Sequence, residues 1–122
     1  MSQRILVVED HEDNRQILRD LLSAAGYEMI EAHDGEQALE RVAVRPDLIL
    51  MDIQLPGIDG YEVTRRIKAD PALAAIPIIA VTSYALTGDD AKARAAGCDD
   101  YVAKPFSPRQ LLAKIREYLP PT

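Results

Sequence analysis

The chain has 122 residues, 48% of them hydrophobic and 28% charged, which suits one globular domain with a core of its own. Its net charge of −6 disfavours nonspecific binding to nucleic acid, and no apolar run approaches the roughly 20 residues that span a bilayer. The single cysteine, Cys98, excludes an internal disulfide and is expected to be a small buried residue. Because no signal peptide opens the chain, we expect a cytoplasmic protein that contacts neither nucleic acid nor membrane.

Hydrophobic runs and helix-type patterns alternate five times along the chain. Each run holds several apolar residues in succession, as strands buried on both faces of a sheet do. The expected strands are residues 4–8, a short one centred on Met29 and Ile30, Leu48 to Asp52, Ile78 to Thr82, and Tyr101 to Ala103.

A helix is expected after each strand. These helices run from Asp13 to Ala25, from Asp34 onward, through Val63 and Ile67, from Asp89 to Ala96, and from Ser107 through Leu119. Gly26 ends the first helix, and capping-box patterns begin the second and the last. The first helix should turn Ile17, Leu18, Leu21, Leu22 and Ala25 inward, whereas the fourth has only alanines for an apolar face and should pack loosely.

The strict alternation of strand and helix predicts a parallel sheet that helices cover on both faces. We therefore predict an α/β fold, a flavodoxin-like doubly wound sheet of five parallel strands in the order 2-1-3-4-5 with five helices. A single domain is expected to span residues 1–122, with no output domain attached.

Three acidic residues stand at the ends of two predicted strands. Glu9 and Asp10 follow the first strand, and Asp52 ends the third. The carboxyl ends of parallel strands meet at one edge of a sheet, and neighbouring strands lie about 4.8 Å apart, so the three carboxylates should share a pocket. Carboxylates at such a short distance repel one another, which raises their pKa values, and a hard cation between them removes the repulsion. The sequence therefore predicts a site for Mg²⁺, or for Mn²⁺.

Two further polar residues close strands at the same predicted edge. Thr82 ends the fourth strand, and Lys104 follows the fifth. With a metal bound, the pocket would offer a nucleophilic carboxylate together with metal, hydroxyl and ammonium groups that can hold phosphoryl oxygens. This combination indicates phosphoryl transfer to a carboxylate.

Four segments, in this order, carry a specific resemblance to a known family. They are VVED (7–10), DLILMDIQLPGIDGYEV (47–63), PIIAVTS (77–83) and AGCDDYVAKPF (96–106). Over its whole length the chain resembles the response-regulator receiver domains of bacterial two-component signalling. It is similar to stand-alone regulators of the DivK type and to the receivers of hybrid histidine kinases.

The resemblance implies a role for each residue of the pocket. Asp52 would accept a phosphoryl group from a histidine kinase or a histidine phosphotransfer protein. Asp10, Asp52 and the backbone carbonyl of Gln54 would bind Mg²⁺, and Glu9 would act through water. Thr82 and Lys104 would contact the phosphoryl oxygens, in a signalling switch that catalyses its own phosphorylation and dephosphorylation rather than in an enzyme.

The resemblance also implies how the signal is read. Thr82 and Tyr101 would form a switch that changes the face made by the fourth helix, the fifth strand and the fifth helix, where an unnamed downstream protein binds. The bond between Lys104 and Pro105 would be cis. Gln54 and Tyr84 are candidates for tuning dephosphorylation, and the protein would be a monomer or a weak phosphorylation-dependent dimer.

Several alternatives stay open beside this interpretation. The two acids after the first strand can be helix caps, and Tyr101 can be an ordinary half-buried aromatic residue. His11 is expected to be solvated, although it lies next to the pocket. The chain can be a receiver excised from a hybrid histidine kinase or a larger regulator. An aspartate-nucleophile phosphohydrolase is disfavoured because Asp52-Ile53-Gln54 is not a D-x-D motif, and a flavin carrier because residues 9–13 are acidic.

Overall fold

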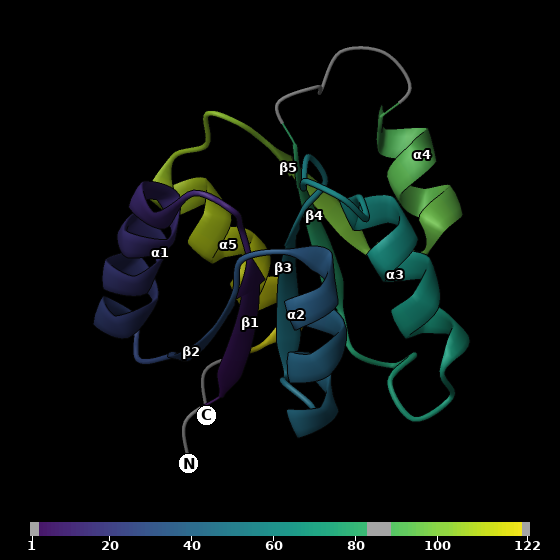
Figure 1. Cartoon of the computed structure of the whole chain (residues 1–122). Helices are drawn as coiled ribbons and strands as arrows, with labels where there is room; N and C mark the ends of the chain where they lie inside the picture. The colour runs from purple at the N-terminus through teal and green to yellow at the C-terminus, as the bar shows by residue number, and fades with distance from the viewer. Residues whose placement is uncertain (1–2, 83–88, 121–122) are drawn as a thin grey trace.

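The computed structural model describes residues 3–82 and 89–120, which form one parallel sheet between two layers of helices (Figure 1). The strands are β1 (Arg4–Val8), β2 (Glu28–Ala32), β3 (Leu48–Asp52), β4 (Ile78–Thr82) and β5 (Asp100–Ala103). Every pairing is parallel, and the strand order is β2-β1-β3-β4-β5. The predicted order 2-1-3-4-5 is therefore confirmed.

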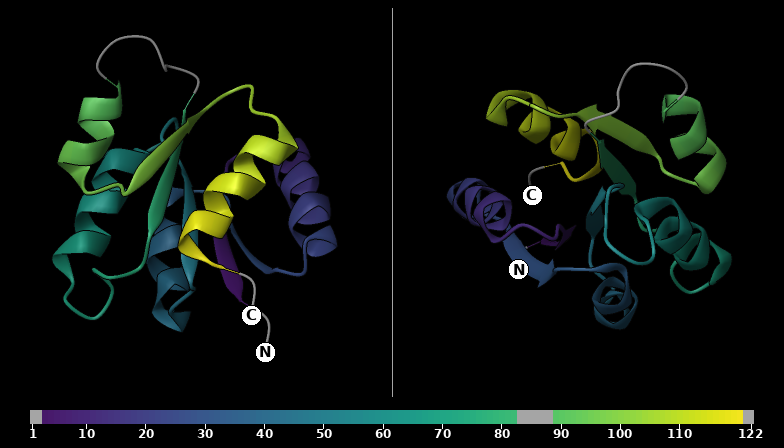
Figure 2. Two further views of the ribbon diagram at one scale, coloured as in Figure 1. Left: turned by 180° about the vertical axis from the view of Figure 1, so that it is seen from behind. Right: turned by 45° about the horizontal axis from the view of Figure 1, so that its top comes forward.

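Helices cover both faces of this sheet, as Figure 2 shows from behind and from above. The helices are α1 (Glu12–Ala24), α2 (Gly35–Arg41), α3 (Gly60–Ala69), α4 (Asp89–Ala96) and α5 (Pro108–Tyr118), and the 3₁₀ turn η1 (Val42–Val44) extends α2. Helices α1 and α5 lie on one face, while α2, α3 and α4 lie on the other. The doubly wound arrangement places the carboxyl ends of all the strands at one edge.

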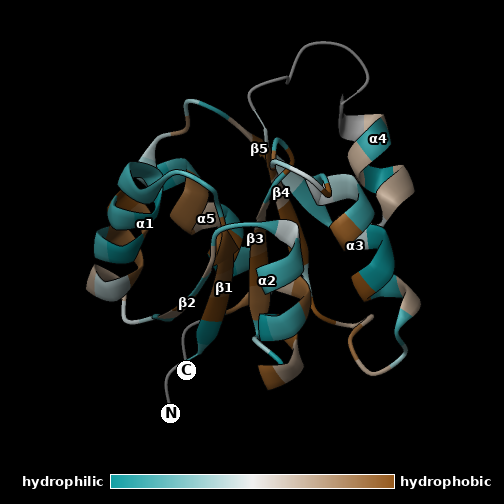
Figure 3. Ribbon diagram, viewed as in Figure 1, coloured by the Kyte–Doolittle hydropathy of each residue, from teal (hydrophilic) through white to brown (hydrophobic). Residues whose placement is uncertain are grey.

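The core forms because alternate strand residues point to opposite faces. Leu48 and Leu50 pack with α1 and α5, whereas Ile49 and Met51 pack with the helices of the other face. The central strands are brown in Figure 3, while the outer sides of the helices are largely teal. Asp52 continues the alternation of β3, so its side chain extends toward the α1 and α5 face, where it meets Glu9, which follows β1.

Helix α1 differs in two respects from its prediction. It spans Glu12–Ala24, one residue earlier at each end, and Gly26 follows it with a φ of 89° that ends the helix. Ile17 was expected in the core, but its side chain is 59% exposed. Leu18 and Leu22 point at the sheet instead, so Ile17 lies at the rim of the helix, beside a cavity.

The capping residues of two other helices behave as local chemistry predicts. Ser107 accepts a hydrogen bond from the Gln110 amide, and Gln110 bonds back to Ser107, which completes the predicted capping box of α5. At α2, Asp34 accepts from the Gln37 amide, but the Gln37 side chain accepts from the His33 amide, so only half of that box forms.

Gly60 allows α3 to begin directly against the end of β3. A Cβ atom at this position would lie 2.4 Å from the carbonyl oxygen of Asp52, and the Gly60 amide donates to the carbonyl of Ile53 over 3.1 Å. Any larger residue would push the helix away from the strand end. Gly60 therefore helps to hold Asp52 in place.

Helix α4 has the predicted range, whereas α5 is one residue shorter at each end than predicted, because Ser107 and Leu119 are its caps. Ala93 and Ala96 of α4 are buried, and Cys98 is buried after that helix, as expected. Helix α3 buries Val63 and Ile67, the two residues expected on its inner face. Within the described ranges, no helix is both long enough and apolar enough to cross a membrane.

Candidate functional site at the carboxyl edge of the sheet

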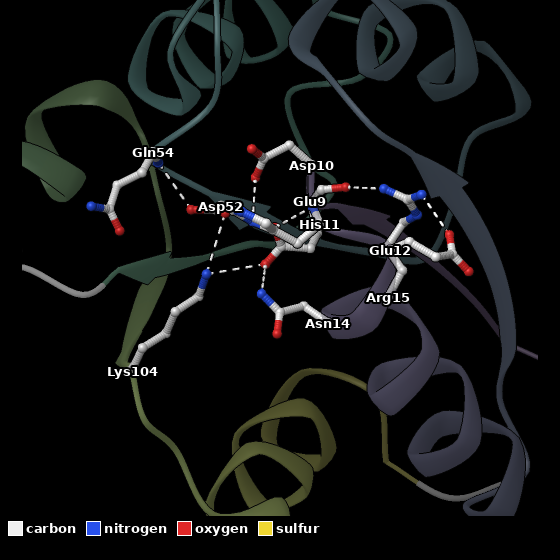
Figure 4. A network of polar contacts seen from close by, with 9 residues as sticks. All are labelled: Glu9, Asp10, His11, Glu12, Asn14, Arg15, Asp52, Gln54 and Lys104. Carbon is white, nitrogen blue, oxygen red and sulfur yellow. Dashed lines mark hydrogen bonds and ion pairs between the residues drawn. The ribbon is translucent and has the colours of Figure 1, made fainter.

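The structure brings two buried carboxylates and a lysine together at the carboxyl edge (Figure 4). Lys104, which follows β5, places its Nζ 3.0 Å from Glu9 Oε1 and 3.3 Å from Asp52 Oδ2. Each of the two acids is 3% exposed. Residues far apart in the sequence thus share one small site because β1, β3 and β5 end at the same edge.

Glu9 is held by donors from three directions. Its carboxylate accepts from the backbone amide of His11 over 3.1 Å, from Asn14 Nδ2 over 3.2 Å and from Lys104. Burial alone would raise the pKa of Glu9, but the hydrogen bonds from the His11 amide and Lys104, together with the charge of Lys104, outweigh it and lower the pKa to about 2. Glu9 therefore stays ionised at every physiological pH.

The pKa of Asp52 is shifted in the opposite direction. Burial raises its pKa to about 6, and the negative charge of Glu9 adds to the rise, although the Gln54 amide donates to Oδ1 over 2.9 Å. Lys104 partly offsets this, and the two acids in turn raise the pKa of the lysine against the effect of its burial. A carboxylate that is expensive to ionise is a stronger base, and so a better nucleophile, than an exposed one.

Asp10 offers an oxygen that is ready for a cation. Its Oδ1 is buried, and no donor among the described residues forms a hydrogen bond to it, although His11 Nδ1 lies 3.2 Å away. One ligand atom from each of Glu9, Asp10 and His11 lies within 4.8 Å of the other two. A buried carboxylate oxygen without a donor costs free energy unless a cation satisfies it, so these residues fit a divalent metal.

Thr82 and Tyr101 lie on the other face of the sheet edge. Thr82 is buried, and its carbonyl accepts from the Lys104 amide over 2.7 Å. Tyr101 pairs with Ala80 in the sheet, two residues before Thr82, so both side chains belong to the α3 and α4 face. Tyr101 packs there against the cluster that contains Ala93 of α4. Tyr84, the candidate for tuning dephosphorylation, lies outside the described residues.

One detail of the geometry matches an implication of the resemblance: the Lys104–Pro105 peptide bond is cis. The Gln54 amide donates to Asp52 Oδ1, and the role of the Gln54 carbonyl as a metal ligand stays a prediction. The His11 side chain is 71% exposed, as expected for a solvated residue.

A cavity of about 500 Å³ opens from the site between α1 and the connection from β5 to α5. Asp52, Glu9 and Lys104 lie on its wall together with mostly apolar residues. These include Val7, Leu18, Leu50, Val81, Ile17 and Phe106. The apolar wall explains why the two acids are so strongly desolvated.

Sequence reasoning missed two residues that support the site. Asn14 bonds the Glu9 carboxylate, and Arg15 donates to the Glu9 carbonyl over 2.7 Å. Both lie in the first turn of α1, where a polar residue ordinarily faces solvent. In the sequence, only their spacing of five and six residues from Glu9 could have indicated these contacts. That spacing predicts a contact only once the path of the turn between β1 and α1 is known.

Comparison with known proteins agrees with the geometry. A family model described as the response regulator receiver domain matches residues 5–116. The polar-differentiation response regulator DivK of Brucella anthropi is 46% identical over 120 residues, which cover 98% of each chain.

Solved structures match equally well. The receiver domain of the sensor histidine kinase PA1611 from Pseudomonas aeruginosa, which has a magnesium ion coordinated in its active-site cleft, has a TM-score of 0.90 at 39% identity and 98% coverage of both chains. The chemotaxis protein CheY4 of Vibrio cholerae has a TM-score of 0.91 at 28% identity, covering 97% of this chain and 99% of its own.

Proposed function

Because this chain belongs to the response regulator receiver family, we propose that it is a signalling switch operated by phosphorylation of Asp52. The observation that carries the proposal is the burial of Asp52 beside a lysine. Asp52 is 3% exposed, its pKa is raised to about 6, and Lys104 Nζ lies 3.3 Å from its Oδ2. A desolvated carboxylate beside a fixed cation is suited to attack phosphorus.

In the proposed reaction, a carboxylate oxygen of Asp52 attacks the phosphorus of a partner's phosphohistidine. The new P–O bond forms as the P–N bond breaks, and the departing imidazole takes up a proton. Hydrolysis of the aspartyl phosphate by water would return Asp52 to its carboxylate form. Both steps need charge stabilisation at the phosphoryl oxygens, which this chain can supply itself.

Four groups would hold the metal that this chemistry needs. We assign the direct contacts to the carboxylates of Asp10 and Asp52 and the carbonyl of Gln54, with Glu9 acting through water. The unpartnered Oδ1 of Asp10 supports the assignment. When bound, Mg²⁺ would neutralise charge on the phosphoryl oxygens, and Mn²⁺ has the same ligand preference.

Lys104 and Thr82 would then act on the phosphoryl group directly. The ammonium of Lys104 already lies between the two buried acids, and a small rotation would bring it to a phosphoryl oxygen. Thr82 would donate its hydroxyl to another of these oxygens. Gln54, at the mouth of the site, would influence how readily water reaches the phosphoryl group.

The signal would leave the site through the α4 and β5 side of the molecule. If the Thr82 hydroxyl moves toward the phosphoryl group, it vacates space that Tyr101 can fill from the same face of the sheet. Helix α4 is held by alanines, which bury little apolar area, so a small free energy can shift its position. We propose that the surface of α4, β5 and α5 binds the downstream protein.

The phosphoryl donor would be a histidine kinase or a histidine phosphotransfer protein in the cytoplasm. Both a stand-alone regulator and the receiver of a sensor kinase are among the similar proteins, so the chain can act alone or as the receiver of a larger protein. In either setting we expect a monomer, or a dimer that forms weakly on phosphorylation.

Acetyl phosphate and Mg²⁺ test the acceptor. We expect one phosphoryl group to be added, found by intact mass, and none to be added to Asp52→Asn. Asp20→Asn, which changes an exposed aspartate of α1, is the matched control and should behave as the wild type. Peptide mapping that places the group on any other residue would reject the assignment.

Beryllofluoride, which mimics the bound phosphoryl group, tests the output surface. Backbone amide spectra should change around α4, β5 and the start of α5, and the changes should be much smaller in Thr82→Ala at saturating beryllofluoride. Amide shifts confined to residues around Asp10 and Asp52, with α4 and β5 silent, would contradict the proposed output.

A further inference from the structure

Arg15 makes an unusual contact from α1 back to the acidic turn. Its side chain is only 13% exposed, and Nη1 donates to the backbone carbonyl of Glu9 over 2.7 Å (Figure 4). That carbonyl belongs to the peptide bond that joins Glu9 to Asp10. Arg15 therefore touches no acidic side chain of the site, but it holds the main chain that carries two of them.

The contact has a geometric consequence for Asp10. A peptide unit is planar, so a hydrogen bond that holds the Glu9 carbonyl also fixes the amide and the Cα of Asp10. The direction of the Asp10 side chain, and with it the buried Oδ1 without a hydrogen bond, depends on this plane. The amide of Glu9 is already fixed by the carbonyl of Ala32, so the turn is held on both sides of Glu9.

Arg15 is itself held in this position by two acids. Its Nη2 lies 2.6 Å from Glu12 Oε2 in α1, and its Nε lies 3.3 Å from Glu31 Oε1 in β2. Arg19, one turn later, binds the same Glu31 with Nε and Nη2. The guanidinium of Arg15 is thus oriented before any ligand arrives, as a group that positions others should be.

We propose that Arg15 is a positioning residue that sets the affinity of the acidic turn for its divalent cation. The inference rests on the proposed function, since it concerns the metal that the phosphorylation of Asp52 requires. Arg15 would not touch the cation. Arg15 would keep the Glu9–Asp10 peptide in the one orientation that presents the buried Asp10 oxygen to the cation.

Arg19 provides a matched control for this inference. Both arginines lie on α1, both pair with Glu31 and Glu12, and both carry one positive charge. Only Arg15 has a hydrogen bond to the Glu9 carbonyl. Loss of charge near the site, or loss of the ion pair with Glu31 of β2, would change the Mg²⁺ affinity of an Arg15 variant and an Arg19 variant alike. Loss of the hydrogen bond to the Glu9 carbonyl would change it only in the Arg15 variant.

The test measures the dissociation constant of Mg²⁺ by calorimetry in wild type, Arg15→Ala, Arg15→Lys and Arg19→Ala. Arg15→Ala should weaken binding about 10-fold, as removal of groups that orient metal ligands does, while Arg19→Ala should change it less than about 2-fold. Arg15→Lys can still donate to the carbonyl and should recover part of the affinity. Its intermediate affinity tests the proposal even where Arg15→Ala does not fold.

A second readout separates positioning from general damage to the site. In phosphorylation by acetyl phosphate, Arg15→Ala should raise the half-saturating Mg²⁺ concentration about 10-fold and leave the rate at saturating Mg²⁺ within about 2-fold. Equal effects of the two arginine variants, or wild-type Mg²⁺ affinity in both Arg15 variants, would overturn the inference alone. No Mg²⁺ binding by the wild type would instead overturn the proposed function.

Discussion

Two lysines lie at opposite edges of the sheet, and each contacts acidic side chains in a different way. At the amino edge, Lys68 Nζ donates to the carbonyls of Ala74 and Ile76 over 3.0 and 2.8 Å and to Asp99 Oδ2 over 3.0 Å. Asp99 also accepts from the amide of Ile78, where β4 begins. One cation faces one carboxylate there, and all three ammonium protons can be used.

At the carboxyl edge, the charges do not balance. Lys104 is shared by Glu9 and Asp52, and Asp10 lies beside them with a buried oxygen to which no described residue donates a hydrogen bond. Burial raises the pKa of Asp52, and the negative charge of Glu9 adds to the rise. The difference teaches that the Lys68 cluster pairs one cation with one carboxylate, whereas the carboxyl edge carries more negative than positive charge, which is the condition that the proposed cation would relieve.

Removal of Lys68 should cause the largest loss of stability. In Lys68→Met, two carbonyls and Asp99 lose a charged donor, so the free energy of unfolding should fall by about 2 kcal/mol. Urea unfolding measures this, with Lys92→Met at an exposed position of α4 as the control. A loss no greater than that of the control would show that the amino-edge cluster is not structural.

Mg²⁺ should stabilise the protein, and only through the other edge. At a free concentration ten times its dissociation constant, Mg²⁺ should raise the free energy of unfolding by about 1.4 kcal/mol in the wild type. Lys68→Met should keep this increment and Asp10→Asn should lose it, as thermal melts with and without the ion will show. The same increment in Asp10→Asn would remove the acidic turn from the cation site.

Neutralising Asp52 should stabilise the protein when no metal is bound. Folding raises its pKa from 3.8 to about 6, so its favourable contribution is present at low pH and is lost as the pH rises through this range. Without metal, Asp52→Asn should be more stable than the wild type by about 3 kcal/mol at pH 7, and the difference should shrink as the pH falls and vanish only well below the unfolded pKa of 3.8. Urea unfolding in the presence of a chelator measures the difference in stability at each pH. A variant that is less stable than the wild type at pH 7 would mean that ionised Asp52 does not destabilise the fold.

The sequence was sufficient for features that depend on neighbours along the chain. Four or five successive apolar residues before Asp52 require a strand that is buried on both faces, and their alternation with helices requires parallel strands. Those two facts already bring the residues after each strand to one edge. That is why the hydrophobic pattern is enough to place Glu9, Asp52 and Lys104 at one edge.

The tertiary structure decided what depends on how elements pack. Ile17 fits the apolar face of α1 by periodicity, but the position of α1 against the sheet directs Leu18 and Leu22 inward and leaves Ile17 59% exposed. Arg15 reads as a surface residue of α1 until the turn after β1 brings the Glu9 carbonyl within 2.7 Å of it.

The electrostatics of the site were likewise decided only in three dimensions. The sequence by itself determined which charges meet at the carboxyl edge, because strand ends are set by local hydrophobicity. Only the folded structure determined that Asp52 is buried beside the charge of Glu9, and that the His11 amide and Lys104 donate to Glu9. One pKa therefore rises to about 6 and the other falls to about 2. Such differences come from burial and from hydrogen bonds between residues far apart in the chain, and these depend on distances that no sequence pattern contains.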